Sequence, residues 1–454
     1  MTDRAYFIGI GGIGMSAIAR FYQYEGYEVA GYDKTPSDLT GELQNEGMEI
    51  HFSDCVACIP EQFRNRDTLV VYTPAVPDNS VELNYFRQTG NEPVKRSAVL
   101  GMIARDKKVL AVAGTHGKTT TSTLLAHLMT VVSDGCTAFL GGISKNYNSN
   151  LLLSKSKWMV AEADEYDRSF LRLYPHIAIV TAADADHLDI YGTEKEMKKS
   201  FGDFVSQIDP DGVLILKEGT DIPSDKIKCR TYSYSYDNKG TDFYAFNIEL
   251  NRGFHKFDIH TPAGTIDNCT LGLPGWVNIE NAVAAVAASI LAGADRKMIR
   301  NALETFSGVK RRFDLRLNIP EHAYIDDYAH HPEELRASIT SVRQMFPGRK
   351  ILGVFQPHLY TRTRDFAVEF AESLSLLDEL ILMDIYPARE LPIEGVTSEI
   401  IFDRVRIENR IMCSREKLME TLADRDIDVL ITLGAGDIDR FVEPITKLLT
   451  PKMT

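Results

Sequence analysis

Short apolar runs alternate with amphipathic segments from the start of the chain. AYFIGI (5–10), YEVAGYD (27–33) and TLVVYTPAV (68–76) are apolar enough for buried strands, and residues 15–24 between the first two have helical spacing. Strands that alternate with helices in this way predict a parallel sheet with helices packed on its faces.

The alternation recurs in two later blocks. We expect strands in the second block at VLAVAG, WMVAEAD, HIAIVTAA and GVLILK, and in the third at AYIDDYA, KILGVFQP, ELILMDIY and VLITLGAG. Between about residues 229 and 269, β-branched and aromatic residues favour antiparallel hairpins inserted before a helix. The pattern predicts an α/β protein with three domains, at residues 1–105, 106–310 and 311–454.

Composition narrows the range of partners. The formal net charge is −14 over 454 residues, and nucleic acid is not an expected partner because duplex-binding proteins usually present a basic face. No run reaches the ~18 apolar residues of a membrane helix, and the first residues lack the basic leader of a signal peptide. Cys55 and Cys58 are interpreted as free thiols rather than as a zinc site. We therefore expect a cytoplasmic protein without membrane insertion.

A turn rich in glycine and threonine follows the strand VLAVA and precedes an apolar helix. Its residues are Gly114, Thr115, His116, Gly117, Lys118, Thr119 and Thr120. Backbone N–H groups at such a helix start bind phosphate, Lys118 can reach the β- and γ-phosphates of ATP, and the Thr119 hydroxyl can ligate Mg²⁺. The first glycine of the general phosphate-loop pattern is Val112 here. A purely structural turn would not explain the lysine, so a phosphate loop is predicted.

Acidic residues follow two successive strands of the same block. Glu162 and Glu165 belong to the run 161–167, and a second run occupies 184–189. Acidic runs alone are usually solvated. Here they end parallel strands beside the phosphate loop, where carboxylates can hold Mg²⁺ against ATP. Because side chains alternate along a strand, Glu162 and Glu165 are expected on opposite faces if the strand continues that far.

A second glycine loop opens the chain. Gly9, Gly11 and Gly14 fit G-x-G-x-x-G between a strand and a helix, with Gly12 inside the loop and Asp33 at the end of the second strand. This arrangement binds a pyrophosphate at the helix start but does not identify the nucleotide. An NAD-dependent domain is one interpretation. A UDP-sugar, which also carries a pyrophosphate, agrees better with a second nucleotide loop in the same chain.

Polar residues also follow strands of the third block. Tyr328 and His330 follow AYIDDYA and are candidate site residues, whereas His331 is interpreted as a helix cap or core contact before Pro332. Further on, Arg362 and Arg364 can clamp an anion. The alternative for these arginines is surface ion pairing with the nearby residues Asp365 and Glu369.

Taken in order, these motifs resemble the Mur ligase family over essentially the whole chain. The resemblance rests on GIGGIGMSAIA, AGTHGKTTT, AEADEYDRSF, DADHLDIYG, NIENAVAA, VKRRFD, DDYAHHPEEL, FQPHLYTRTRDF and DIYPARE. It implies a Rossmann-like N-terminal domain that binds a UDP-substrate, a central P-loop ATPase-type domain and a Rossmann-like C-terminal domain for the amino acid and ligation.

The same resemblance implies an activity. GIGGIGMS, DDYAHHP and YTRTRD look specific to the alanine-adding member. This implies an ATP-dependent ligase that joins L-alanine to the lactyl carboxylate of UDP-N-acetylmuramate through an acyl phosphate, in peptidoglycan precursor synthesis. A ligase that attaches a whole peptide to the same sugar nucleotide, an NAD-dependent oxidoreductase and a non-catalytic sugar-nucleotide sensor are the alternatives.

Site residues are implied by the resemblance as well. The expected catalytic residues are Lys118, His330 and Arg362. Those expected to hold Mg²⁺ are Thr119, Glu162 and His187. Adenine contacts are expected from Asn278 and Asn281, and UDP-sugar or amino-acid contacts from Gly9, Gly11, Gly12, Gly14, Asp33, Tyr328, His330 and Arg362.

Two positions depart from the family pattern. The histidine of the family motif H-N-x-x-N is Val277 here. In the family motif P-H-R-Y-T-R, the first arginine is replaced by Leu359. Other Mur ligases use a carbamylated lysine, for which this sequence has no clear equivalent.

Overall fold

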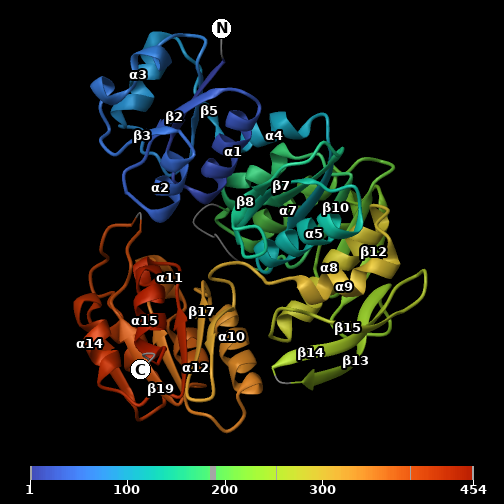
Figure 1. Ribbon diagram of the computed structural model, residues 1–454, viewed down its shortest axis with the longest axis vertical. Helices are drawn as coiled ribbons and strands as arrows, with labels where there is room; N and C mark the ends of the chain where they lie inside the picture. Colours follow the sequence, from blue (N-terminus) through green and yellow to red (C-terminus); the bar gives the residue numbers. More distant parts are fainter. Residues whose placement is uncertain (1–2, 185–190, 252, 389, 452–454) are drawn as a thin grey trace. The chain divides into compact units, whose positions relative to one another are not determined.

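The protein is described by a computed structural model that covers residues 3–184, 191–251, 253–388 and 390–451 (Figure 1). The chain forms two compact units. The first unit comprises Met1–Phe246, Phe257–Cys269 and Glu280–Ser307, and the second comprises Asn247–Lys256, Thr270–Ile279 and Gly308–Thr454. Within the described residues, no helix is long and apolar enough to cross a membrane.

The first sheet is parallel, as the strand–helix alternation predicted. Its order is β3-β2-β1-β4-β5. The strands are β1 (Arg4–Ile8), β2 (Glu28–Tyr32), β3 (Glu49–His51), β4 (Leu69–Tyr72) and β5 (Val94–Lys95), and the helices are α1 (Ile13–Tyr24), α2 (Asp38–Asn45), α3 (Val81–Thr89) and α4 (Arg96–Ala104). Ile8 pairs with both Tyr32 and Tyr72, so the carboxyl ends of the three central strands meet at one edge.

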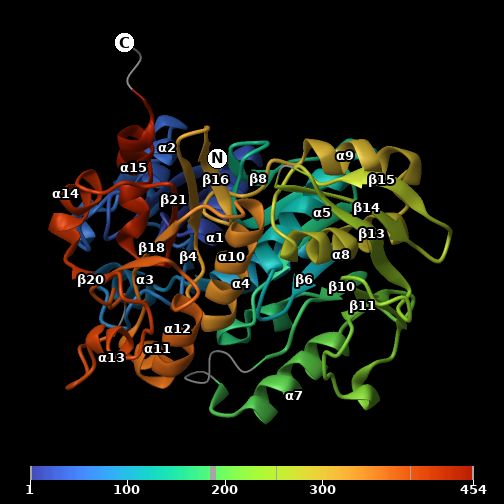
Figure 2. The same cartoon turned by 90° about the horizontal axis from the view of Figure 1, so that it is seen from below.

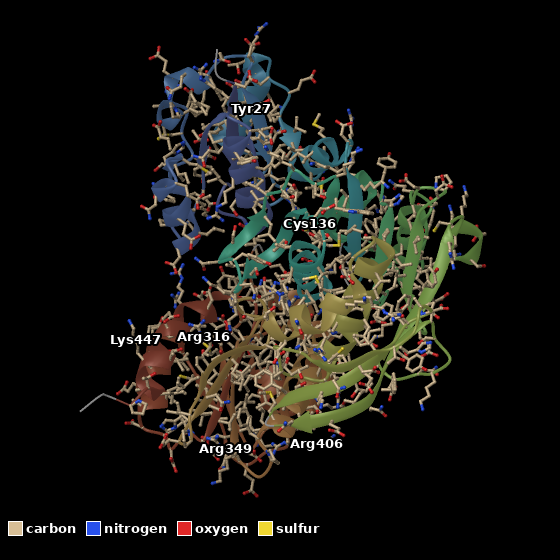
Figure 3. All side chains as sticks on the ribbon, turned by 45° about the vertical axis from the view of Figure 1, so that its right-hand side comes forward. Tyr27, Cys136, Arg316, Arg349, Arg406 and Lys447 are labelled. Atoms are coloured by element: carbon tan, nitrogen blue, oxygen red, sulfur yellow. A yellow bond between two sulfur atoms is a disulfide. The ribbon has the colours of Figure 1, made fainter. Side chains whose placement is uncertain are left out.

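The second sheet carries the phosphate loop and has the order β15-β14-β13-β12-β11-β10-β6-β9-β7-β8. Its strands are β6 (Lys108–Ala113), β7 (Thr137–Ser144), β8 (Ser149–Leu152), β9 (Trp158–Ala163), β10 (Ile177–Val180), β11 (Val213–Lys217), β12 (Arg230–Ser235), β13 (Phe243–Asn251), β14 (Phe254–His260) and β15 (Ile266–Thr270). Strands β9 and β10 pair in parallel on either side of β6. Cys136, labelled in Figure 3, is buried just before β7.

One prediction for this sheet was wrong for the first of its strands. Residues 229–269 were expected to form antiparallel hairpins, but β12 pairs in parallel with both β11 and β13. β12 therefore extends the parallel sheet. Its pairing with β13 is limited to Tyr234–Phe243 and Ser235–Tyr244, because β13 begins beside the end of β12. The short connection between β13 and β14 leaves only an antiparallel arrangement for those two neighbours.

Four described helices accompany the second sheet, and two of them, α5 and α8, lie where the sequence predicted a helix. They are α5 (Lys118–Val132), α7 (Glu194–Val205), α8 (Val277–Leu291) and α9 (Ile299–Thr305). α5 packs against β7 and β9, and most of its side chains are buried. The buried first turns of α5 support the loop that precedes it.

The third sheet is parallel except at one edge, and its order is β16-β17-β21-β18-β19-β20. Its strands are β16 (Asp314–Asn318), β17 (Ala323–Asp327), β18 (Ile351–Phe355), β19 (Glu379–Met383), β20 (Arg410–Cys413) and β21 (Val429–Leu433). Its helices are α10 (Pro332–Met345), α11 (Tyr360–Asp365), α12 (Ala367–Leu374), α13 (Glu399–Phe402), α14 (Leu418–Ala423) and α15 (Val442–Leu449), and α10 packs against α12 (Figure 2).

Seven 3₁₀ helices complete the described secondary structure. They are η1 (Val56–Cys58), η2 (Glu61–Phe63), η3 (Tyr166–Arg172), η4 (Ser224–Lys226), η5 (Arg296–Met298), η6 (Arg415–Lys417) and η7 (Asp437–Phe441). The first of them corrects a prediction. Cys55 and Cys58 were expected to be free thiols, but they form a disulfide across the η1 turn, which brings their Cα atoms to 5.4 Å.

Candidate active site

The predicted phosphate loop is a tight turn between β6 and α5. Gly114 has φ 130° and Gly117 has φ 78°, conformations that L side chains rarely adopt. A Cβ at Gly114 would overlap the Thr181 hydroxyl and lie 2.8 Å from the Ala182 amide nitrogen. Val112, which replaces the usual first glycine, lies inside β6 and is fully buried. The glycines of this loop thus stand where its backbone requires them.

Neighbouring strands hold the rest of the loop. The Thr115 amide donates to the Ala182 carbonyl at 3.2 Å, and the Thr181 hydroxyl donates to the His116 carbonyl. The Thr115 hydroxyl accepts from the Asp184 amide at 3.3 Å. Thr120 is buried in the first turn of α5. The loop is therefore fixed before any nucleotide binds.

Lys118 is buried and paired with a carboxylate. Its ammonium lies 2.7 Å from the Glu165 carboxylate and donates to the Gly114 carbonyl at 2.7 Å. Burial alone would lower the pKa of Lys118, but the negative charges of Glu165, Asp164 and Glu162 raise it above its ordinary value. The side chain is therefore a fixed cation at the phosphate loop.

The expected metal ligands are only partly placed. The Thr119 hydroxyl donates to the Glu162 carboxylate at 3.1 Å. A Cβ at Gly141 would overlap this carboxylate, so the glycine makes room for it. Two hard oxygen donors side by side at a phosphate loop fit Mg²⁺. His187 lies outside the described residues, within which no group of three His, Cys, Asp or Glu side chains could hold a metal ion.

The expected contrast between Glu162 and Glu165 does not apply, because β9 ends before Glu165. Both carboxylates meet the phosphate loop, Glu162 at Thr119 and Glu165 at Lys118. β9 ends at Ala163, and the chain then turns into η3, where Asp167 and Arg168 have φ near 50°. Alternation of side chains therefore does not extend to Glu165, which is fully buried.

The first glycine loop joins β1 to α1. Gly9 has φ 87°, and Gly12 is the N-cap residue of α1, which has no side-chain cap and no acidic residue in its first turn. The Asp33 carboxylate accepts the Gly11 amide at 2.8 Å. A Cβ on Gly14 would lie 2.5 Å from a guanidinium nitrogen of Arg96. An open helix start with a cation beside it is suited to an anion.

The two asparagines expected at adenine lie in the first two turns of α8. The Asn278 amide donates to the Pro274 carbonyl at 2.6 Å. The Asn281 side-chain oxygen accepts from Thr121 at 3.2 Å and would lie 2.7 Å from a Cβ on Gly117. Asn281 therefore borders the phosphate loop.

In the second unit, Tyr328 is held by two arginines. Its ring lies 5.1 Å from the Arg311 guanidinium and 4.6 Å from that of Arg312. The Tyr328 amide donates to the Arg311 carbonyl at 2.7 Å. Arg311 itself has φ 63° and donates to the Gly434 carbonyl at 2.7 Å. The arginine pair of the motif VKRRFD thus fixes the tyrosine.

His330 lies edge-on to Tyr328 and to His358, at ring distances of 5.3 and 6.0 Å. Its Nδ1 lies 3.0 Å from the Tyr328 carbonyl, which can only accept, so Nδ1 carries the proton and Nε2 is left as an acceptor. Burial lowers the pKa of His330 to about 4; Glu334 opposes the shift and the Arg362 charge adds to it. His330 is therefore neutral near pH 7 and lies within the field of Arg362.

Three neighbouring positions complete this cluster. His331 precedes α10 and packs edge-on against Phe366 at 4.9 Å, which confirms its predicted structural role. Arg364 is half exposed and donates to Asp365 at 2.7 Å, as its surface interpretation predicted. Leu359, which replaces the family's arginine, is buried with φ 72° and precedes α11.

Sequence reasoning missed two residues of this arrangement. It did not assign Glu165 to Lys118, because the pairing depends on where β9 ends and on the helical backbone of Glu165. It also passed over Arg96, whose guanidinium lies against Gly14. The signal for Arg96 was a basic pair, Lys95–Arg96, at the end of a strand and the start of a helix.

Family models match three successive parts of the chain. The Mur ligase family catalytic domain matches residues 4–108, the Mur ligase middle domain 112–289 and the Mur ligase glutamate ligase domain 311–436. The chain belongs to the Mur ligase family. Mur ligases are ATP-dependent ligases, and the three-domain α/β fold predicted from the sequence is confirmed. The oxidoreductase interpretation of the first glycine loop has no support in this family.

Relatives of this Mur ligase match it over nearly its whole length. UDP-N-acetylmuramate–L-alanine ligase of Parabacteroides distasonis is 54% identical over 98% of this chain and 96% of its own. The Porphyromonas gingivalis W83 protein of the same name is 51% identical over 98% and 99%.

Solved structures agree with this assignment. UDP-N-acetylmuramate-alanine ligase of Thermotoga maritima has a TM-score of 0.83 at 28% identity, over 98% of this chain and 99% of that one. A murein peptide ligase of Psychrobacter arcticus has a TM-score of 0.75 at 21% identity over the full length of both chains, which shows the shared fold alone.

Proposed function

We propose that this Mur ligase joins L-alanine to the lactyl carboxylate of UDP-N-acetylmuramate, with cleavage of ATP to ADP and phosphate, in cytoplasmic peptidoglycan precursor synthesis. The observation that carries the proposal is the 54% identity, over 98% of the chain, to a relative named for this reaction. The phosphate loop with its buried lysine supports the ATP-dependent half of it. We assign substrate, ATP and amino-acid domains to residues 1–105, 106–310 and 311–454.

Activation of the carboxylate is the first step. Backbone N–H groups of residues 114–119 and the Lys118 ammonium bind the ATP phosphates, and Asn278 and Asn281 contact adenine. A lactyl carboxylate oxygen attacks the γ-phosphorus, ADP leaves, and an acyl phosphate remains. Thr119, Glu162 and His187 would hold Mg²⁺, which neutralises phosphate charge when bound. When ATP binds, the Lys118 ammonium exchanges its ion pair with Glu165 for a phosphate oxygen. It is therefore charged and correctly placed before the reaction begins.

Amide formation is the second step, and it uses residues of the C-terminal domain. The alanine amine attacks the acyl carbon, and the tetrahedral intermediate expels phosphate. Arg362 provides a positive charge for a carboxylate or the developing oxyanion. Neutral His330 presents Nε2 as an acceptor for an amine hydrogen. Tyr328, which contacts Arg311 and Arg312, orients the His330 ring. Gly9, Gly11, Gly12, Gly14 and Asp33 bind the UDP portion.

Phosphate release from ATP tests the proposal. We expect release to require both UDP-N-acetylmuramate and an amino acid, with L-alanine preferred over glycine, serine and a tripeptide. A preference for the tripeptide would instead identify the peptide-attaching alternative, whose fold is also similar. Binding of the sugar nucleotide without any phosphate release would identify a sensor.

A further inference from the structure

Arg96, beside the first glycine loop, has a guanidinium with few partners in the described part of the chain. It is the first residue of α4, and its side chain is about one-fifth exposed. Within the described part of the chain, its guanidinium makes no hydrogen bond and one long ion pair, at 3.8 Å from the Asp164 carboxylate. A guanidinium has five N–H donors, so most of its capacity is left for a ligand or for water.

Arg20, on the neighbouring helix α1, shows the contrast. It donates to Glu42, Glu46 and Asn150 at distances of 2.6–3.1 Å, and it is more buried than Arg96. Arg20 is therefore a structural arginine that holds α1 against its surroundings. The donors of Arg96 have no comparable acceptors.

The place of Arg96 indicates what it would bind. Its guanidinium lies over Gly14, in the first turn of α1, where the helix start has no side-chain cap and no acidic residue. A cation against the positive end of a helix dipole is unfavourable on its own, and an anion that touches both relieves the repulsion. The glycine at position 14 leaves the space that brings the guanidinium against the helix.

We propose that Arg96 binds the diphosphate of the sugar nucleotide at the first glycine loop, and that Asp164 is its counter-ion in the nucleotide-free protein. The proposal rests on the proposed function, which places a UDP-sugar at this loop. A guanidinium binds phosphate oxygens in pairs, and the diphosphate supplies the negative charge that both Arg96 and α1 lack. Asp164 lies next to Glu165, so each of two successive carboxylates neutralises the cation of one nucleotide loop.

Calorimetric titration of the full chain with UDP, without ATP, tests this assignment. We expect Arg96→Met to weaken UDP binding about 10- to 100-fold, since a hydrogen bond to a charged group contributes on that scale. Arg96→Lys should recover part of the loss because it keeps the charge without the paired donors. Asp164→Asn should tighten binding about two- to fivefold because it removes a competing anion.

Lys95→Met is the matched control. Lys95 carries the same charge one residue earlier, but it pairs with Asp167 at 3.1 Å on the surface. We expect it to change UDP affinity less than about threefold, since solvent screens an exposed charge. Thermal unfolding without ligand should show that Arg96→Met folds like the unsubstituted protein.

Two results would overturn the assignment of Arg96. One is unchanged UDP binding by Arg96→Met, and the other is an equal loss in Lys95→Met, which would mean that only the general positive potential matters. If the unsubstituted protein binds UDP-N-acetylmuramate and releases phosphate in either case, the proposed function stands without Arg96. If it binds neither UDP nor the sugar nucleotide, both proposals are wrong.

Discussion

A lysine that is buried and charged before its substrate arrives is the main feature of this site at the residue scale. Lys118 has an anionic partner in Glu165, which is itself fully buried. Removing a charge from water is costly unless a partner compensates for it. The pair therefore keeps the ammonium in place until an ATP phosphate replaces the carboxylate.

Glu165→Gln should destabilise the nucleotide-free protein by about 3 kcal/mol, because it leaves Lys118 as a buried charge without its closest anion. Asp167→Asn is the control, since it breaks the exposed pair with Lys95 and should cost less than about 1 kcal/mol. Urea unfolding of both variants measures the difference, and saturating ATP should narrow it by supplying another anion. Equal destabilisation by the two substitutions would contradict this account of Lys118.

His330 gives the second residue-scale prediction. Burial lowers its pKa to about 4 in the folded protein, against about 6.5 in an unfolded chain. The fold therefore favours the neutral ring, and its contribution to stability is complete above pH 6.5 and is lost as the pH falls towards 4. With one-fifth of the side chain exposed, we expect a loss of about 1 kcal/mol between pH 7 and 5 from this group.

His330→Gln should remove that part of the pH dependence. Urea unfolding at pH 8, 7 and 5 measures it, and the difference between the two proteins should be constant from pH 8 to 7 and change only below that. An identical fall in stability of both proteins between pH 7 and 5 would show that His330 is not held neutral by the fold.

Residue roles were predictable from sequence where local spacing determines geometry. Lys118 follows a buried strand and a glycine turn, so its position at a helix start could be derived. The ion pair with Glu165 could not, because it depends on the chain leaving β9 after Ala163 and taking helical backbone angles at Glu165. The catalytic and ligand-binding roles carried over from the family remain predictions.

At the scale of single elements, the turn between β6 and α5 explains why the loop tolerates so little change. Gly114 combines φ 130° with neighbours from β10 and the residues that follow it. The loop thus depends on two separate features, a backbone conformation and a lack of space. Separate glycines in the chain allow these features to be tested one at a time.

Gly114→Ala should lower the free energy of unfolding by more than 2 kcal/mol, roughly the sum of a conformational cost of 1–2 kcal/mol and an overpacking cost of similar size. It should also abolish ATP binding because Thr181 or the loop must move. Gly219→Ala is the control, since Gly219 has φ 80° but open space around it, and only the conformational cost is expected. Chemical unfolding and ATP titration test this; similar losses of stability in both variants would contradict the packing argument.

The end of β9 carries the metal prediction. Glu162→Gln removes a negative oxygen donor beside Thr119 and should raise the Mg²⁺ concentration for half-maximal phosphate release about tenfold or more, because Mg²⁺ prefers carboxylate oxygen. Affinity for UDP-N-acetylmuramate should change little. Asp167→Asn, on the same segment but paired with Lys95, is the control. An unchanged Mg²⁺ requirement in Glu162→Gln would remove this residue from the metal site.

Elements with strong apolar patterns were predictable, and those defined by pairing were less so. The parallel strands of all three sheets follow from buried runs between helices. The parallel pairing of β12 could not be predicted in this way. Polar and aromatic residues alternate in its sequence, RTYSYS, as in an edge strand, although β11 and β13 flank it on both sides. The Cys55–Cys58 bond likewise depends on the close approach of two ends of a 3₁₀ turn.

On the scale of the whole molecule, the net charge and the proposed substrates have the same sign. The chain carries a net charge of −14, and both nucleotide substrates are highly negative. Local geometry accounts for this, since each nucleotide loop places a cation at an open helix start, Lys118 at α5 and Arg96 at α1. The near-complete coverage of the relatives, 98% of this chain, means that the sequences match across all three sheets.

The central claim is that ATP activates the lactyl carboxylate as an acyl phosphate before alanine attacks. The most direct measurement uses UDP-N-acetylmuramate with ¹⁸O in that carboxylate, together with ATP, Mg²⁺ and L-alanine, and analyses the products by mass spectrometry. We predict an alanine amide that keeps one labelled oxygen and inorganic phosphate that carries the other, with both products lost in Lys118→Ala. Amide formed without label in the phosphate, or no amide in the presence of all substrates, would contradict the account.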